Sequence, residues 1–132
     1  MLRLKLMSGA VLAVLSVIAC GSPNGPTPQP TTLLNTTLAL PAGANCSTGG
    51  NSATFSPTNG KTITIIAQGS GAVNPAITLY APDFATQLGG AIGTGGRATL
   101  TFPITQTGNH HISVCDQTGT GGSVTVTITQ PA

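Results

Sequence analysis

The sequence predicts an all-β fold, an antiparallel two-sheet β-sandwich of the jelly-roll kind, and three observations support it. Apolar and polar residues alternate with a period of two through most of the domain. Threonine fills many outward positions, where its β-branch suits a pleated strand and its hydroxyl faces water. Glycine-rich stretches separate these runs, and no amphipathic helix interrupts them. An open β-barrel is the structural alternative.

The alternation predicts five strands. They are expected at 62–68, 76–80, 97–104, 110–114 and 123–129. Successive side chains of a strand point to opposite faces of the sheet, so one set in each run must face the core. The predicted inward residues are Ile63, Ile65, Ala67, Ile77, Leu79, Ala98, Leu100, Phe102, Ile112, Val114, Val124, Val126 and Ile128.

Turn signals lie between these runs. Asn59 and Gly60, in "TNGK", predict a two-residue hairpin that follows a short strand. Glycine-rich stretches at 69–71, 89–96 and 119–122 are expected to be connections. The stretch from 89 to 97 superficially resembles a phosphate-binding loop, but it has no Lys-Ser/Thr pair and no helix after it, so a flexible connection is expected. Lys61 and Arg97 are expected to be edge charges that discourage strand pairing between molecules.

A targeting segment precedes the domain. Arg3 and Lys5 form a short basic region, and the 14 residues from Leu6 to Ala19 are apolar or small throughout. As a helix this stretch would extend about 21 Å, which is less than the roughly 30 Å hydrocarbon core of a bilayer. Residues 1–19 are therefore interpreted as a cleavable signal peptide.

The end of this segment, Val17, Ile18, Ala19 and Cys20, resembles the lipobox of bacterial lipoproteins. The resemblance implies that Cys20 receives a diacylglycerol and becomes the first residue of the mature chain. Each buried CH₂ contributes about 0.8 kcal/mol, so two or three acyl chains hold a protein firmly on a membrane. Gly21 stands where aspartate would signal inner-membrane retention, so the outer membrane is expected in a source with two membranes. The alternative is an ordinary cysteine beside a secretory cleavage site.

Two regions are expected in the mature chain. Residues 20–32 comprise the lipidated cysteine and "GSPNGPTPQPTT", which has four prolines and no charge and is expected to be an extended tether. Residues 33–132 form one domain of ordinary size, the β-sandwich.

The charge of the mature chain excludes some functions. Removing Arg3 and Lys5 from the total of four basic and two acidic residues leaves Lys61, Arg97, Asp83 and Asp116, a net charge of zero. No basic patch remains to neutralise phosphates, so nucleic-acid binding is not expected.

Cysteine usage agrees with export. With Cys20 used by the lipid, Cys46 and Cys115 form an even pair that would meet oxidising conditions, and a disulfide is predicted. The alternatives are a zinc site, which two cysteines alone cannot complete, and a redox pair, which the wide spacing disfavours.

From about residue 52 the chain resembles the bacterial pre-peptidase C-terminal (PPC) domain, a jelly-roll β-sandwich. The similarity lies in a Gly-Lys-Thr start of a strand, a Leu-Tyr-x-Pro-Asp segment and a late Gly-x-x-x-Ile-x-Val segment. The residues that carry it are Gly60, Lys61, Thr62, Leu79, Tyr80, Pro82, Asp83, Gly108, His110, Ile112 and Val114. The resemblance implies the sandwich fold and the role of a non-catalytic accessory module on exported proteins.

Two departures limit that resemblance. His110 replaces the tyrosine that the family has in the late segment. Some members bind calcium or collagen through acidic and aromatic clusters, whereas this chain has two aspartates, one tyrosine and no tryptophan. Neither binding activity is carried over, and no metal or other cofactor is expected.

Catalysis is not expected either. His110 and His111 are adjacent in a strand and point to opposite faces, His110 inward and His111 outward, so they cannot chelate one metal together without a bulge. A hydrolytic triad could be drawn with Asp116 and a serine. However, Gly-x-Ser-x-Gly is absent and no serine lies in a nucleophile elbow.

The expected function is therefore that of a membrane-anchored lipoprotein whose sandwich is an envelope protein-interaction or structural module. Glycan or matrix adhesion is the alternative, and it requires an exposed aromatic platform. Tyr80 and His111 are the candidate ligand-contact residues, and Phe55 or Phe84 could extend the platform. The domain is expected to be a monomer.

Overall fold

The computed structural model describes residues 25–132 as eight strands without a helix. The signal peptide and Cys20 lie outside the described residues. The strands are β1 (Thr31–Leu40), β2 (Asn51–Phe55), β3 (Thr62–Gly69), β4 (Pro75–Tyr80), β5 (Gln87–Ile92), β6 (Arg97–Pro103), β7 (His110–Asp116) and β8 (Gly122–Gln130). No helix long and apolar enough to cross a membrane occurs within residues 25–132.

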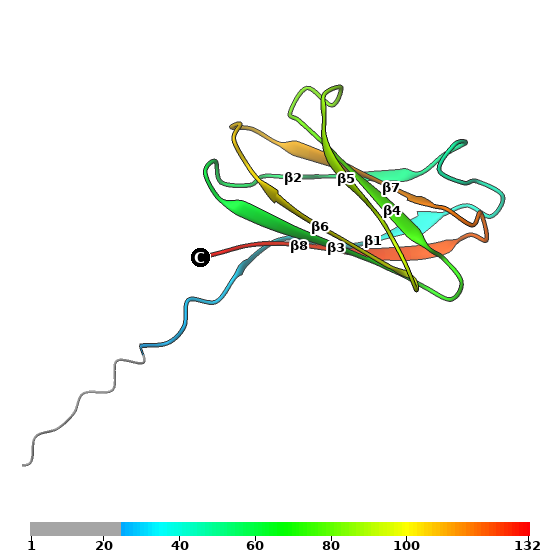
Figure 1. Cartoon of the computed structure of the whole chain (residues 1–132), viewed down its shortest axis with the longest axis horizontal. Coiled ribbons are helices and arrows are strands. Elements are labelled where there is room, and N and C mark those ends of the chain that lie inside the picture. The colour runs from blue at the N-terminus through cyan, green and yellow to red at the C-terminus, as the bar shows by residue number, and fades with distance from the viewer. Residues whose placement is uncertain (1–24) are drawn as a thin grey trace, which may run out of the picture.

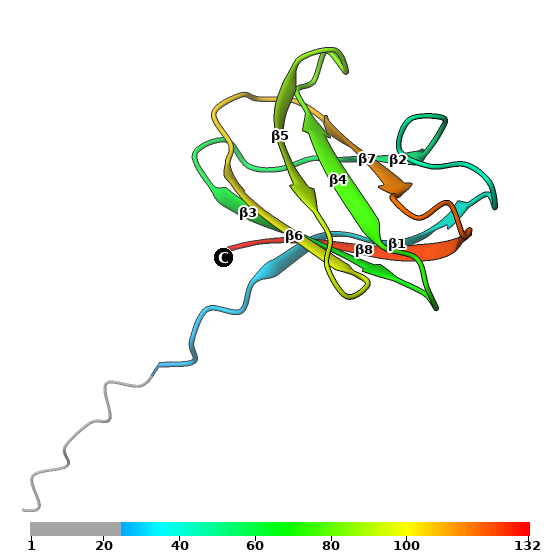
Figure 2. The ribbon, with the colours of Figure 1, turned by 45° about the vertical axis from the view of Figure 1, so that its right-hand side comes forward.

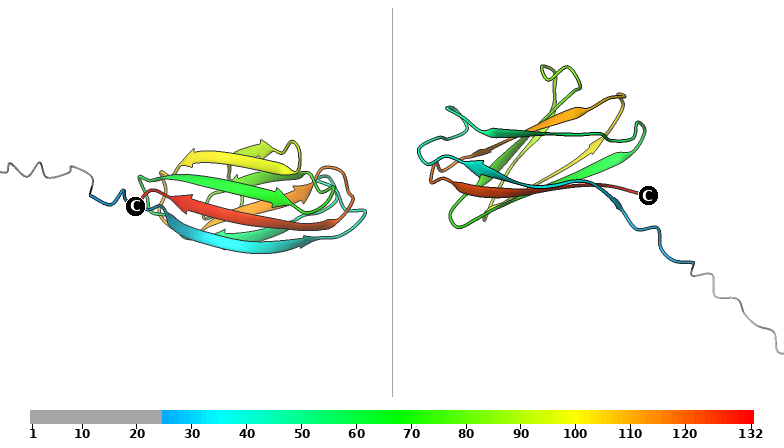
Figure 3. Two further views of the ribbon diagram at one scale, coloured as in Figure 1. Left: turned by 90° about the horizontal axis from the view of Figure 1, so that it is seen from below. Right: turned by 180° about the vertical axis from the view of Figure 1, so that it is seen from behind.

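The strands form two stacked antiparallel sheets, which confirms the predicted sandwich (Figure 1). The first sheet has the order β1-β8-β3-β6, and the second has the order β2-β7-β4-β5. Seen from below, the four strands of the first sheet lie side by side, with β1 and β6 at its edges (Figure 3). The chain crosses repeatedly between the sheets, so most contacts join residues that are distant in sequence.

The core lies between the two sheets and is aliphatic. Most strands contribute alternate side chains to it, as the period-two pattern predicts, whereas β5 contributes only the half-buried Leu88. Eleven of the thirteen predicted inward residues are buried, and Leu100 and Phe102 on the edge strand β6 are half-buried. The large aliphatic side chains that are fully buried are Ile63, Ile65, Val73, Ile77, Leu79, Ile104, Ile112, Val114, Val124, Val126 and Ile128.

Two strands, β1 and β5, were not predicted from the sequence. β1 begins at Thr31, inside the segment interpreted as tether, and pairs with β8. β5 occupies 87–92, so the expected flexible connection over 89–97 is wrong for its first half. Gly89 and Gly90 pair with Leu79 and Thr78 there. The ladder with β4 stabilises β5 in spite of its two glycines, which local propensity alone disfavours.

The predicted hairpin at Asn59 and Gly60 is also wrong. β2 pairs with β7 and β3 pairs with β6 and β8, so the turn joins the two sheets instead of two neighbouring strands. Gly60 does adopt a positive φ of 81°, and its N–H donates to the carbonyl of Ile104 (2.9 Å). The turn chemistry was therefore identified correctly, but tertiary pairing decided which strands it connects.

The two charges expected at edges have different positions. Arg97 begins the edge strand β6, as expected. Lys61 precedes the central strand β3, and its Nζ donates to the carbonyl of Ala132 (2.9 Å). The Lys61 side chain therefore holds the C-terminus and does not protect an edge.

Candidate binding site

An aromatic patch lies at one end of the second sheet, on its outer face. Tyr80, the last residue of β4, is directly opposite His111 of β7. Phe84, from the turn between β4 and β5, packs against both rings. Its ring centroid lies 5.6 Å from that of Tyr80 and 4.5 Å from that of His111. We call Tyr80, Phe84 and His111 the aromatic patch. The structure thus brings together the two predicted ligand-contact residues and Phe84, one of the two phenylalanines considered for the platform.

The turn that carries Phe84 is held rigidly. The N–H of Phe84 donates to the carbonyl of Ala81, and the N–H of Ala81 donates to the carbonyl of Thr86, both at 2.9 Å. The carboxylate of Asp83 accepts bonds from the N–H groups of Ala85 (2.9 Å) and Thr86 (2.8 Å) and from the Thr86 hydroxyl (2.6 Å). The Thr86 side chain first, and then the backbone N–H groups, lower the pKa of Asp83 to about 2. The carboxylate therefore stays charged at neutral pH.

Phe84 has an unusual backbone conformation. It is the one non-glycine residue of 25–132 with a positive φ (56°), in a left-handed region that costs an L-residue about 1–2 kcal/mol. The preceding Pro82 and Asp83 form a turn that ordinarily continues with glycine. The side chain of Phe84 is nevertheless 51% exposed, so core packing does not repay that cost. Figure 2 shows this turn at the top of the molecule, between β4 and β5.

The other two residues of the patch are oriented by the sheet. Nδ1 of His111 is hydrogen-bonded to the hydroxyl of Thr54 on β2 (3.0 Å), which fixes the ring position. Tyr80 is half-buried, and its hydroxyl has no hydrogen-bond partner among residues 25–132. Phe55, considered from the sequence as a platform residue, is only 3% exposed and packs in the core, so that prediction is wrong.

A shallow depression of about 450 Å³ lies farther along the same face. Its lining carries no charge. It contains the small side chains of Ala76 and Thr78, the amide of Gln87, and Ile92, which is 75% exposed. The outer face of the second sheet therefore has an uncharged depression and, at one end, the aromatic patch, and Phe84 and Ile92 are its exposed large apolar side chains.

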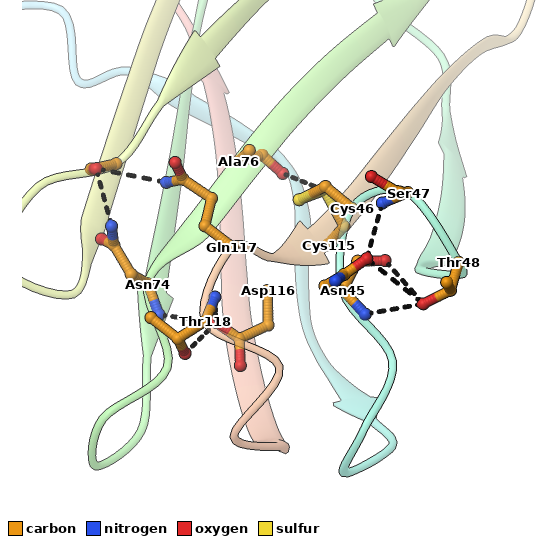
Figure 4. Close-up of a disulfide and its surroundings, with 11 residues drawn as sticks. Asn45, Cys46, Ser47, Thr48, Asn74, Ala76, Cys115, Asp116, Gln117 and Thr118 are labelled. Atoms are coloured by element: carbon orange, nitrogen blue, oxygen red, sulfur yellow. Dashed lines mark hydrogen bonds between the residues drawn. A yellow bond between two sulfur atoms is a disulfide. The ribbon is translucent and has the colours of Figure 1, made fainter.

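The predicted disulfide between Cys46 and Cys115 is present, beside this depression (Figure 4). It ties the segment between β1 and β2 to the end of β7. Asn45 organises that segment, because its Oδ1 accepts from the N–H of Ser47 (2.9 Å) and its N–H donates to the hydroxyl of Thr48 (2.9 Å). A disulfide is characteristic of proteins in oxidising compartments outside the cytoplasm.

Asp116 is a structural carboxylate. It is 1% exposed and accepts six hydrogen bonds, from the N–H groups of Asn74, Thr118, Thr120 and Gly121 and from the hydroxyls of Thr118 and Thr120. Burial raises the pKa of Asp116, but these hydrogen bonds outweigh it and hold the pKa below its ordinary value. Asp116 therefore fastens the loops at its end of the sandwich and has no capacity left for a ligand.

The structure does not assemble the triad that could be drawn from the sequence. His110 and Asp116 lie at opposite ends of β7, about 20 Å apart at the rise of a strand. His110 is fully buried; its Nδ1 donates to the carbonyl of Gly108 (3.0 Å), and its Nε2 has no partner in the described residues. Within residues 25–132, no three His, Cys, Asp or Glu side chains are grouped to hold a metal.

The signal for the patch was present in the sequence only in part. Tyr80 and His111 followed from strand phase, but their direct pairing depends on the register between β4 and β7. The informative local feature was "APDF", a Pro-Asp turn in which phenylalanine stands where glycine is favoured. Interpreting that substitution as the placement of an exposed ring would have favoured Phe84 over Phe55.

Comparisons with known proteins show a fold likeness and no sequence family. No family model matches the chain, and no curated protein matches it. Among solved structures, the chain is similar to the pre-peptidase C-terminal domain of collagenase from Bacillus anthracis, with a TM-score of 0.58 and 14% identity over 73% of this chain and 88% of that one. It also matches PliG of Aeromonas hydrophila, a periplasmic lysozyme inhibitor, with a TM-score of 0.49 and 16% identity over 77% and 84% of the two chains. The described domain thus has a fold similar to the PPC sandwich.

Proposed function

We propose that the mature chain is a bacterial lipoprotein, anchored by acyl chains on Cys20, whose sandwich is a non-catalytic module that binds another envelope protein through the aromatic patch. The basic start, the apolar run and the residues before Cys20 support the anchor. The disulfide supports a location outside the cytoplasm. The outer membrane is the proposed site in a source with two membranes.

The observation that carries the binding role is the placement of Phe84. A large apolar ring is presented on a rigid turn, half in solvent, at the expense of backbone strain. Strain of this kind tends to persist where a function requires it. Aromatic side chains anchor protein interfaces because they bury a large area with little loss of conformational entropy. The uncharged depression farther along the same face provides further area for such a contact.

A neutral glycan is the second candidate ligand. The depression favours it, because its lining offers the hydroxyl of Thr78 and the amide of Gln87 for hydrogen bonds and carries no charge. The rings of the patch favour a protein instead. Phe84 is inclined by 72° to Tyr80 and by 48° to His111, so the three rings form no shared flat platform for a sugar.

Photo-crosslinking in living cells tests the protein-binding role. A photoreactive phenylalanine analogue at position 84 should yield a discrete adduct with another envelope protein. The matched control is the same analogue at Thr101, an exposed position on the outer face of the first sheet, which should yield none. Equal labelling at both positions, or none at either, would contradict the proposal. An adduct with polysaccharide that Tyr80→Ala abolishes would support the glycan instead.

Intact mass spectrometry tests the anchor separately. The membrane-extracted protein should begin at Cys20 and carry the mass of a diacylglycerol and of an amide-linked acyl chain. A mature protein that begins at another residue, or that has Cys20 without acyl mass, would refute the anchor. This result is independent of the crosslink at position 84.

A further inference from the structure

β1 is an edge strand with few of the features that usually protect an edge. It is the outermost strand of the first sheet, and it is ten residues long with no charge and no proline (Figure 3). Exposed edges present unpaired N–H and C=O groups that another strand can bind, and natural proteins commonly block them with lysine, proline or bulges. On the opposite edge of the same sheet, Arg97 and Pro103 stand at the two ends of β6.

The hydrogen bonds around Ser123 show which backbone groups of β1 point outward. Ser123 of β8 uses both its backbone groups on Ser70: its N–H donates to Oγ (3.0 Å), and its carbonyl accepts from the N–H (2.9 Å). Ala39, which is opposite Ser123, therefore directs its backbone groups away from β8. Its carbonyl accepts from Nδ2 of Asn51 (3.1 Å) instead. Alternate residues share this direction, so Asn35 and Thr37 also turn their N–H and C=O groups to the free edge.

The free edge is limited at both ends. A register shift between Thr32 and Leu34 interrupts β1 on one side. Asn51 occupies the carbonyl of Ala39 on the other side. The segment from Leu34 to Leu38 remains, and its centre is Thr36. Within residues 25–132, no hydrogen bond is found to the outward backbone groups of Asn35 and Thr37.

This segment is complementary to a second copy of itself. In antiparallel pairing about a two-fold axis at Thr36, Asn35 of one copy is opposite Thr37 of the other, and the two residues exchange both backbone hydrogen bonds. Leu34 is then opposite Leu38 of the second copy. Both leucines are half-buried and pack against the core, so the pairing would cover apolar surface that the single domain leaves at the edge.

We propose that two copies of the chain associate through β1, antiparallel about Thr36, and form one continuous eight-stranded sheet. The contact replaces the monomer expected from the sequence. A pairing of this length buries less area than a standard stable interface. Confinement to a membrane raises the effective concentration enough to favour it, and this step rests on the anchor under Proposed function. The two-fold axis is perpendicular to the sheet, so both aromatic patches lie on the same side of the dimer.

Disulfide crosslinking at the two-fold axis tests the pairing in the full, membrane-bound chain. In the dimer, Thr36 of one copy would lie opposite Thr36 of the other at a non-hydrogen-bonded position, with the two Cα atoms about 4.5 Å apart. A disulfide can form at this separation. Thr36→Cys should therefore yield a covalent dimer, with the bond at the substituted position identified by mass spectrometry of its peptides. Thr99→Cys, at an exposed position of β6 in the same sheet, is the matched control and should stay monomeric.

A second substitution distinguishes crosslinking that depends on β1 pairing from crosslinking by random collision. Thr37→Pro removes an N–H that points to the free edge and breaks no backbone bond to β8. It also removes the exposed side-chain bond between the hydroxyls of Thr37 and Thr125 (3.1 Å), a small loss that should leave the domain folded. Added to Thr36→Cys, it should reduce the crosslinked fraction by about tenfold, because two intermolecular hydrogen bonds are lost. No dimer from folded, acylated Thr36→Cys protein would overturn the proposal. An unchanged yield with Thr37→Pro, an equal yield from Thr99→Cys, or a crosslink to a different protein would also overturn it.

A spin label at an exposed position covers the case in which Thr36→Cys misfolds. Thr37→Cys places labels on either side of the axis, at diagonal positions whose Cα atoms are about 7–8 Å apart. The labels should give strong dipolar broadening that dilution with unlabelled protein removes. Spectra of the undiluted sample without dipolar broadening would overturn the pairing. The intact mass of the same sample reports acylation at Cys20, so a missing anchor is distinguished from a missing dimer.

Discussion

The imidazole of His111 lies against the ring of Phe84, with centroids 4.5 Å apart, although one residue is in β7 and the other is in the turn between β4 and β5. This contact places a strained, exposed phenylalanine on a fixed support. Tyr80 completes the support from β4. The properties of the patch therefore depend on the turn as much as on the sheet.

The backbone strain at Phe84 predicts an order of stability for two variants. Phe84→Gly and Phe84→Ala both remove the ring and its contacts, so they differ mainly in the cost of the left-handed conformation. Glycine adopts it without strain, and Phe84→Gly should be about 1 kcal/mol more stable than Phe84→Ala. Urea unfolding of both variants measures the difference. Equal midpoints, or a more stable alanine variant, would show that the turn carries no such strain.

Asp116 should contribute far more to stability than Asp83. Asp116→Asn replaces one accepting carboxylate oxygen by an NH₂ donor in a buried site where all six partners are donors. We expect the free energy of unfolding to fall by roughly 3 kcal/mol. Asp83 is exposed at the surface turn, so Asp83→Asn is the matched control and should lose much less. Chemical denaturation at pH 7 measures both. Similar losses in the two variants would contradict the structural role assigned to Asp116.

Both aspartates also predict acid sensitivity. Hydrogen bonds hold the folded-state pKa of each below the ordinary value of 3.8, to about 2 for Asp83. The unfolded chain therefore binds more protons below pH 4, and the free energy of unfolding must fall as the pH falls. The stability they contribute should be complete above about pH 5 and decline from pH 4 toward pH 2. Asp116→Asn should flatten this decline in a series of denaturation curves.

The disulfide should stabilise the domain mainly by lowering the conformational entropy of the unfolded chain. Its cysteines are separated by 69 residues, and closing a loop of that size contributes about 4 kcal/mol in the chain-entropy model. The double variant Cys46→Ser and Cys115→Ser should lose about this much in guanidinium unfolding. Reduced wild-type protein is the control and should lose the same amount. A loss below about 1 kcal/mol in the variant would contradict the entropic account.

The sequence predicted the fold because its strands carry an unambiguous period of two. Ile63, Ile65 and Ile112 could be assigned to the core from neighbouring residues alone, and all three are buried. β5 could not be found in this way, because Gly89 and Gly90 have low strand propensity and the pairing with β4 outweighs it. Which strands the turn at Asn59 connects also depends on long-range pairing, and local turn chemistry does not specify that pairing.

The candidate site was predictable to a similar extent. Strand phase placed His111 outward and His110 inward, as the structure has them. The grouping of Tyr80 with His111 required the register of β4 against β7, and the position of Phe84 required the geometry of its turn. Neither is encoded within a few residues. The burial of Phe55 was missed because its strand was too short to give a clear phase.

Affinity capture with a matched pair of baits tests the central claim most directly. The oxidised domain, residues 25–132, and its Phe84→Gly variant are immobilised at equal density and exposed to the solubilised envelope of the source organism. The account predicts that the wild-type domain retains a specific protein and that the folded variant retains at least about tenfold less of it, as expected when an interface anchor is removed. A protein retained equally by both baits would contradict the assignment of binding to the aromatic patch.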